Sequence, residues 1–74
     1  MKSKTEVLVR FIRKRRKQLG MTQDDLSRRA GVGLRFIRDL EQGKESLRLD
    51  KVNQVLALFG YMTGPIPIED HDGE

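Results

Sequence analysis

The chain of 74 residues contains no cysteine, which excludes both a disulfide framework and a metal site built from thiolates. It also has no apolar run near the ~18 residues that a membrane-spanning helix needs. Its first residues, 1–6, lack the apolar stretch of a secretory signal, so we expect a cytoplasmic protein. A domain this small often completes its core by pairing with a second copy, and a homodimer is therefore expected.

Residue sets for catalysis and metal binding are absent from the sequence as well. The single histidine, His71, lies in an acidic stretch that has no second kind of metal ligand nearby. The sequence contains no paired histidines and no Gly-rich loop of the kind that cradles phosphates. We therefore expect no enzyme activity, no cofactor and no bound metal.

Positive charge is plentiful, and it is unevenly distributed. All fifteen lysines and arginines lie in residues 2–51; with seven acids in residues 1–64, that part of the chain carries +8. The last ten residues contain the other four acids and carry −4. A basic body of this kind fits a polyanion such as DNA, because each neutralised phosphate releases condensed counterions. Charge alone leaves open the alternative of a solvated surface without a partner.

Apolar residues recur at helical spacing in four segments, which predicts an all-α fold with helices over residues 6–19, 23–30, 34–42 and 49–59. Thr22 is the expected N-cap of the second helix, and Asp25 completes its capping box. The residues expected to face the core are Leu8, Ile12, Leu19, Leu26, Ala30, Ile37, Leu40, Leu49, Val52, Val55, Leu56 and Phe59, with Val9 or Phe11 beside the first group and Phe36 beside Ile37.

The C-terminal part of the sequence differs in kind from the helical segments. Pro65 and Pro67 exclude a helix and a central strand but permit a short extended edge segment. We expect residues 1–64 to form the domain and residues 65–74 to form an acidic, flexible tail. Residues 61–68 could pair with the same segment of a second copy. The acidic end could contact a basic partner, although a solubilising role is favoured.

Residues 23–42 have the spacing of a helix-turn-helix, in which a turn of about three residues containing glycine joins two helices. Leu26 is the apolar position of the first helix, Ser27 is small where the helices would touch, and Gly31 stands at the turn. Glycine is favoured at such a turn because the sharp bend commonly needs a left-handed residue. A helix-turn-helix lays its second helix in the major groove of DNA.

Several residues around this motif stand at fixed offsets: Ile12, Arg13, Arg16, Leu26, Gly31, Val32, Ile37 and the runs 20–23 and 40–44. On these residues, the sequence resembles the Xre/Cro-type helix-turn-helix domain of phage repressors over residues 8–60. The resemblance implies a lambda-repressor-like bundle of four or five helices that binds a palindromic operator as a dimer. Within that family, residues 33–44 and 48–52 are most similar to HipB-type antitoxins, which implies a HipA-like kinase toxin as a partner.

The outward face of residues 34–42 supplies the predicted base contacts. Arg35 or Arg38 can grip guanine O6 and N7 with two hydrogen bonds, and Leu34 can touch a thymine methyl group. Asp39 would accept a hydrogen bond from a base amine or pair with Arg35. Arg38 could instead pair with a neighbouring polar side chain and point at solvent.

The resemblance also implies phosphate contacts at Thr22, Gln23 and Gly33. Lys44, just past residues 34–42, and Arg35 are further phosphate candidates. Free amides at a helix N-terminus attract anions, although capping is the larger role expected of Thr22. Where this chain has Gly33, the family commonly has Ser or Thr, so that only the backbone amides remain for such a contact.

Similar domains join the positions of Arg16 and Glu41 by a structural ion pair. Arg16 belongs to a run of five basic residues, 13–17. The pairing of Arg16 leaves the other four, residues 13–15 and 17, to solvent or to the DNA backbone. The leading hypothesis is a dimeric autorepressor that is also the antitoxin of a HipA/HipB-like pair. The alternatives are a stand-alone phage-type or chromosomal repressor, and a module that inhibits a toxin and binds DNA only secondarily.

Overall fold

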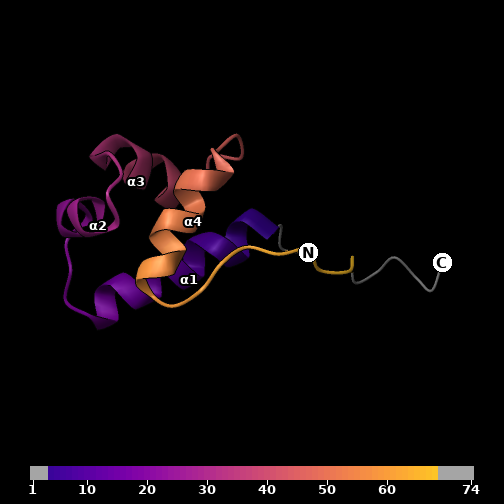
Figure 1. Ribbon diagram of the computed structural model, residues 1–74, viewed down its shortest axis with the longest axis horizontal. Helices are drawn as coiled ribbons and strands as arrows, with labels where there is room; N and C mark the ends of the chain where they lie inside the picture. The colour runs from indigo at the N-terminus through magenta and orange to yellow at the C-terminus, as the bar shows by residue number, and fades with distance from the viewer. Residues whose placement is uncertain (1–3, 69–74) are drawn as a thin grey trace.

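The computed structural model describes residues 4–68, which contain four α-helices and no strand (Figure 1). The helices are α1 (Lys4–Gln18), α2 (Gln23–Ala30), α3 (Leu34–Glu41) and α4 (Leu49–Leu58). The predicted all-α fold is confirmed, with each helix end within two residues of its expected position. None of the helices described is long and apolar enough to cross a membrane.

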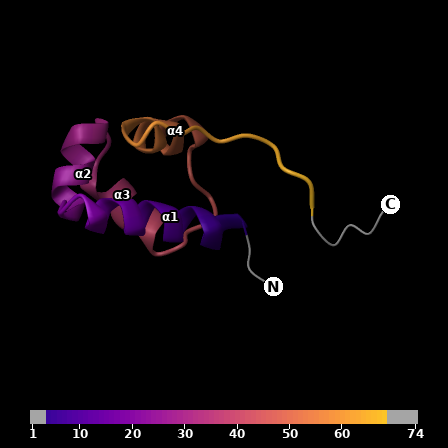
Figure 2. The ribbon, with the colours of Figure 1, turned by 90° about the horizontal axis from the view of Figure 1, so that it is seen from below.

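The helices form a small bundle in which α2 packs against both α3 and α4, and α1 packs against α3. Seen from below, α1 and α4 lie on opposite sides of the bundle and α2 closes one end (Figure 2). The chain after α4 contains no further helix or strand up to residue 68 and extends away from the bundle. This arrangement leaves α3 supported from behind by two other helices.

The boundaries of α2 follow the predicted local chemistry. The Thr22 side chain accepts a hydrogen bond from Asp25 N, and the Asp25 carboxylate accepts one from Thr22 N, both at 3.0 Å. These two bonds satisfy amide groups that a helix start leaves without partners. At the other end, Gly31 has a φ of 78°, in the left-handed region where glycine carries no steric penalty.

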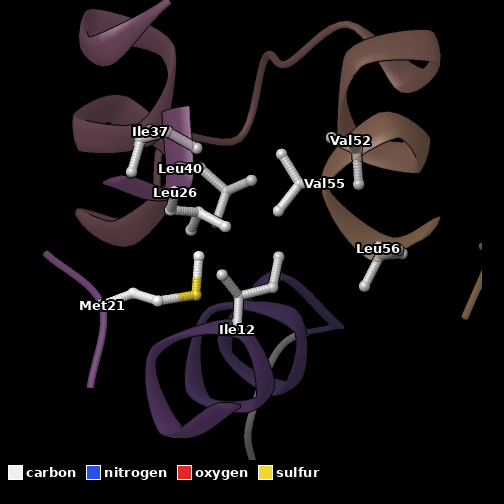
Figure 3. Packing of buried hydrophobic residues seen from close by; sticks show 8 residues of the cluster. All are labelled: Ile12, Met21, Leu26, Ile37, Leu40, Val52, Val55 and Leu56. Atoms are coloured by element: carbon white, nitrogen blue, oxygen red, sulfur yellow. The ribbon is translucent and has the colours of Figure 1, made fainter. Parts of the chain in front are cut away.

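Eight residues from all four helices and the loop after α1 form the buried core (Figure 3). Met21 supplies a core side chain that the helical pattern does not reveal, because it lies in the loop before α2. Partly buried apolar residues, among them Leu8, Phe11, Ala30, Phe36 and Phe59, pack around this centre. The eight core residues are Ile12, Met21, Leu26, Ile37, Leu40, Val52, Val55 and Leu56.

The prediction that Leu19 and Leu49 face the core is wrong. Leu19 is 60% exposed and Leu49 is 62% exposed. Leu19 lies beyond the end of α1 at Gln18, so the helical spacing that points it inward no longer applies. Met21 occupies the core near this end instead. Leu49 is the first residue of α4, and the buried residues of that helix begin only at Val52.

Two neighbouring residues of α4 connect it to other parts of the molecule. The Gln54 side-chain amide donates to the carbonyl oxygens of Ala30 (3.3 Å) and Gly31 (3.4 Å), at the turn between α2 and α3. The Asn53 side-chain oxygen accepts from both the backbone amide and the hydroxyl of Thr63, each at 2.9 Å. Helix α4 therefore holds the helix-turn-helix on one side and the chain that follows α4 on the other.

Candidate nucleic-acid interface

Helix α3 presents one apolar face to the core and one polar face to solvent. Ile37 and Leu40 are fully buried. On the other face Arg35 and Arg38 are exposed, and Leu34 and Asp39 are half-buried beside them. The structure thus places the four residues predicted to read bases together at the surface of one short helix.

The two arginines on this face are available to a ligand. Within residues 4–68, neither Arg35 nor Arg38 forms a hydrogen bond or an ion pair with its side chain. The local pairing considered for Arg38 is therefore not found there. Asp39 pairs with Lys44 at 3.7 Å, rather than with Arg35. The arginines lie three residues apart, and this spacing puts both side chains on the same side of the helix.

The residues predicted to contact phosphates lie at helix ends around α3. Gly33 is the N-cap of α3 and supplies no side-chain hydrogen bond, so the first amides of that helix face outward without a side-chain cap. Thr22 is engaged in the capping box described above. Lys44 follows the C-terminal end of α3 and is exposed, with Asp39 as its ion-pair partner.

The Gln23 side chain has a structural contact that the sequence did not predict. Its amide donates to Glu41 Oε1 at 3.1 Å, which joins the start of α2 to the end of α3. The two residues are 18 positions apart in the chain, so no local pattern signals the contact.

Arg16 and Glu41 form a nearly buried ion pair behind the outward face of α3. Arg16 Nε donates to Glu41 Oε2 at 2.7 Å, Nη2 donates to Oε1 at 3.0 Å, and Nη1 donates to the carbonyl oxygen of Met21 at 2.9 Å. The side chains are only 12% and 4% exposed. Bidentate geometry of this kind fixes orientation as well as distance. The pair therefore holds α1, the loop before α2 and the end of α3 in register.

The ionisation of Glu41 follows from these contacts. Burial alone would raise the pKa of Glu41, but hydrogen bonds from Arg16 and Gln23 and the charges of Arg16 and Arg13 outweigh it. The pKa consequently lies below its ordinary value, and Glu41 is a carboxylate at neutral pH.

The basic run of α1 divides into engaged and available cations. Arg16 is committed to Glu41, and the Arg13 guanidinium lies 3.9 Å from the same carboxylate while remaining half exposed. Arg15 lies over the Phe11 ring, 6.0 Å from its centroid, and donates to the Gln18 side chain at 3.5 Å. Lys14 and Lys17 are exposed.

A second surface, which we call the apolar groove, lies between α1 and the chain that follows α4. It has a volume of about 560 Å³, and none of its lining residues is charged. The Phe11 ring is part of its lining, with its centroid 4.6 Å from that of Tyr61. Met62 and Ile66 are 77% and 62% exposed. The lining residues are Val7, Leu8, Phe11, Leu56, Tyr61, Met62, Thr63, Gly64 and Ile66.

No group of three or more His, Cys, Asp or Glu side chains suited to holding a metal occurs in the part of the chain that the structure describes. His71 and the acidic residues of the predicted tail lie outside the described residues. The site is thus a set of polar and basic side chains on a rigid helical frame.

Comparison with known proteins agrees with this geometry. The helix-turn-helix family HTH_3 matches residues 12–62, which include the last part of α1 and all of the other three helices. The chain is 51% identical over 53 residues to a protein of Sinorhizobium fredii named an uncharacterized HTH-type transcriptional regulator, y4mF. The match covers 72% of this chain and 66% of that protein, just under two thirds of its length. No solved structure matches the chain significantly.

The family match, the relative and the four-helix architecture with its glycine turn agree with one another. The chain belongs to the Xre-like helix-turn-helix family and has a lambda-repressor-like fold.

Proposed function

We propose that this protein is a sequence-specific, DNA-binding transcriptional repressor. The observation that carries the proposal is the pair Arg35 and Arg38, which are exposed on one face of α3 and have no side-chain partner within residues 4–68. Two unpaired guanidinium groups on a helix that is rigidly held from behind suit the bidentate recognition of guanine.

In the proposed complex, α3 enters the major groove with its N-terminal half leading. Arg35 and Arg38 donate to guanine O6 and N7, Leu34 contacts a thymine methyl group, and Asp39 accepts from a base amine. Asp39 also lies beside Lys44, so this ion pair opens when both side chains turn to the DNA.

Phosphate contacts position the frame, and we assign them to the predicted residues. The uncapped amides at Gly33 receive one phosphate, and the N-terminal end of α2 at Thr22 and Gln23 receives another. Lys44 extends the same contacts past the end of α3. Because Gln23 also bonds to Glu41, a phosphate at this position is linked to the buried ion pair.

A homodimer forms part of the proposal, and the apolar groove is its interface. An exposed patch without charged residues marks a site of association, and a two-fold interface uses the same patch on both copies. The chain after α4 offers the complementary part, since Ile68, two residues past the groove residue Ile66, is 62% exposed. The Ile68 side chain of one copy would pack into the groove of the other. A dimer of this kind reads a palindrome whose half-site centres lie about 34 Å apart.

The antitoxin role is the most specific part of the proposal. It is supported by the resemblance of residues 33–44 and 48–52 to HipB-type antitoxins. In that role the protein represses its own operon and binds a HipA-like kinase. If no kinase-like gene lies beside its own, or if a neighbouring kinase does not co-purify with it, the role is that of a stand-alone repressor.

Base reading is tested by selecting binding sites from a randomised duplex library and then measuring affinity for the selected site and for a scrambled one. Arg35→Ala and Arg38→Ala should each reduce discrimination by about 1–3 kcal/mol. Arg29→Ala, on the outer side of α2, is the matched control and should leave discrimination unchanged. The absence of any enriched site with wild-type protein contradicts the proposal.

The dimer is tested by sedimentation at several protein concentrations. Met62→Asp with Ile66→Asp should give a monomer that keeps its helical circular dichroism, because both side chains are on the surface. Leu19→Asp is the control, since Leu19 is equally exposed but lies outside the groove. A wild-type protein that stays monomeric at high concentration contradicts this part of the proposal.

A further inference from the structure

A second groove, of about 640 Å³, lies on the opposite side of α1 from the apolar groove and is lined with cations. One wall is a stripe of α1 in which the basic residues recur at the three- and four-residue spacing of one helix face. The other wall is the end of α3 and the turn that follows, from Glu41 to Glu45. We call this the α1 basic groove. Its cations are Arg10, Arg13, Lys14 and Lys17.

Negative charge in the α1 basic groove is partly neutralised. Three acids line the groove. One of them, Glu41, forms an ion pair with Arg16 inside the fold, and this pairing neutralises its charge. The other two acids, Glu6 and Glu45, also line the groove. The cations are less occupied: Lys14 and Lys17 form no hydrogen bond or ion pair within the described residues, and Arg13 has only its 3.9 Å approach to Glu41.

The position of this groove relative to α3 indicates its ligand. Gln42 and Gly43 line it, and they directly follow the last residue of α3. Lys44, the next residue, is an expected phosphate contact. In the proposed complex, DNA that lies along α3 would continue past this end of the helix, next to the groove that Gln42 and Gly43 line.

We propose that the α1 basic groove is a second phosphate-binding surface, which grips the DNA backbone beyond the part that α3 reads. The inference rests on the proposed DNA-binding function and adds to it a surface outside the helix-turn-helix. Lys14 and Lys17 supply the contacts, with Arg10 and Arg13 beside them. Since phosphates carry no sequence information, this surface adds affinity for any duplex and leaves the choice of sequence to α3.

The test is the salt dependence of binding to a mixed-sequence duplex of about 30 base pairs, which is about three helical turns and longer than two half-sites whose centres lie one turn apart. Each phosphate contact contributes about 0.9 to the slope of log affinity against log salt concentration. The slope is negative, so Lys14→Ala with Lys17→Ala should make it shallower by about one to two and should weaken binding about eightfold per lost contact at ~0.1 M salt. The ratio between a selected site and the mixed-sequence duplex should not change.

Arg28→Ala with Arg29→Ala removes the same charge from the last turn of α2 and is the control. Both double variants should melt close to wild type, because all four side chains are exposed and the ion pairs of Arg28 with Asp24 and Asp25 are surface pairs, which contribute little to stability. If the Lys14 and Lys17 variant has the slope of the control, the inference is overturned while the proposed function stands. If wild-type protein binds no duplex even at low salt, the proposed function itself fails.

Discussion

Replacing Glu41 by alanine should destabilise the whole domain, even though Glu41 lies on the helix that is proposed to read DNA. The carboxylate is 4% exposed and accepts hydrogen bonds from Arg16 and Gln23. Alanine removes these acceptors together. Arg16, which is 12% exposed, then keeps only its bond to the Met21 carbonyl. The result is a cation inside the fold without a counter-charge.

Breaking a buried ion pair by removing one partner costs about 3–5 kcal/mol. A domain of this size has a total stability on the order of 4–11 kcal/mol, from roughly 0.05–0.15 kcal/mol per residue. Because 1 kcal/mol shifts the melting temperature of a small domain by about 4–8 °C, Glu41→Ala should lower it by at least 12 °C or so. Unfolding in the range of growth temperatures is the expected consequence.

The assay is thermal unfolding followed by circular dichroism, at fixed protein concentration because dimerisation also shifts the melting temperature. Arg16→Met with Glu41→Leu is the informative second variant. Replacing both charges by apolar side chains is often neutral or stabilising, so it should recover most of the loss. A Glu41→Ala protein with the same melting temperature as wild type would refute the reasoning, because the carboxylate would then contribute no net stabilisation.

Three further predictions concern the frame of the motif. Thr22→Ala removes the hydroxyl that accepts from Asp25 N, although the backbone amide of residue 22 can still donate to Asp25, and should cost about 1 kcal/mol, seen as a melting temperature lower by about 4–8 °C. Gly31→Ala forces a side chain into a φ of 78° and should lower the free energy of unfolding by about 1–2 kcal/mol. Gly33→Ser should instead raise it by a few tenths of a kcal/mol, because Gly33 has an ordinary φ and open space around it. Equal effects of the two substitutions in chemical denaturation would contradict this prediction. The pKa of Glu41 is lowered in the fold, so its contribution is present above its ordinary value of 4.5 and is lost as the pH falls below that value through the folded one; a melting temperature that stays constant down to strongly acid pH would contradict it.

The helices and most of the core follow from local rules in the sequence. Apolar spacing located all four helices, and capping chemistry placed Thr22 and Gly31 correctly at the two ends of α2. Spacing failed at Leu19 because periodicity holds only while the helix continues, and α1 ends one residue earlier. A different local signal points to Met21: it precedes the N-cap and Leu26 is the fourth residue of the helix, which is the pattern of a hydrophobic staple.

The site is predictable in its residue types and less so in its contacts. Outward positions on α3 follow from the burial of Ile37 and Leu40, so the sequence correctly predicts that Arg35 and Arg38 face outward. The bond from Gln23 to Glu41 was not, because it joins residues from different helices. The two grooves beside α1 also depend on how that helix crosses the bundle, which a linear pattern does not record.

Asn53 and Gln54 are adjacent in α4 but bond in different directions, one to Thr63 and the other to the turn between α2 and α3. In the proposed assembly, these bonds connect α4 to the dimer interface at one residue and to the DNA-binding motif at the next. Linkage between two binding events is reciprocal. In that proposed assembly, a kinase that displaced the segment around Thr63 would change the affinity for DNA, and DNA would change the affinity for the kinase by the same factor. A repressor built in this way could respond to its partner through one helix turn, without a separate sensory domain.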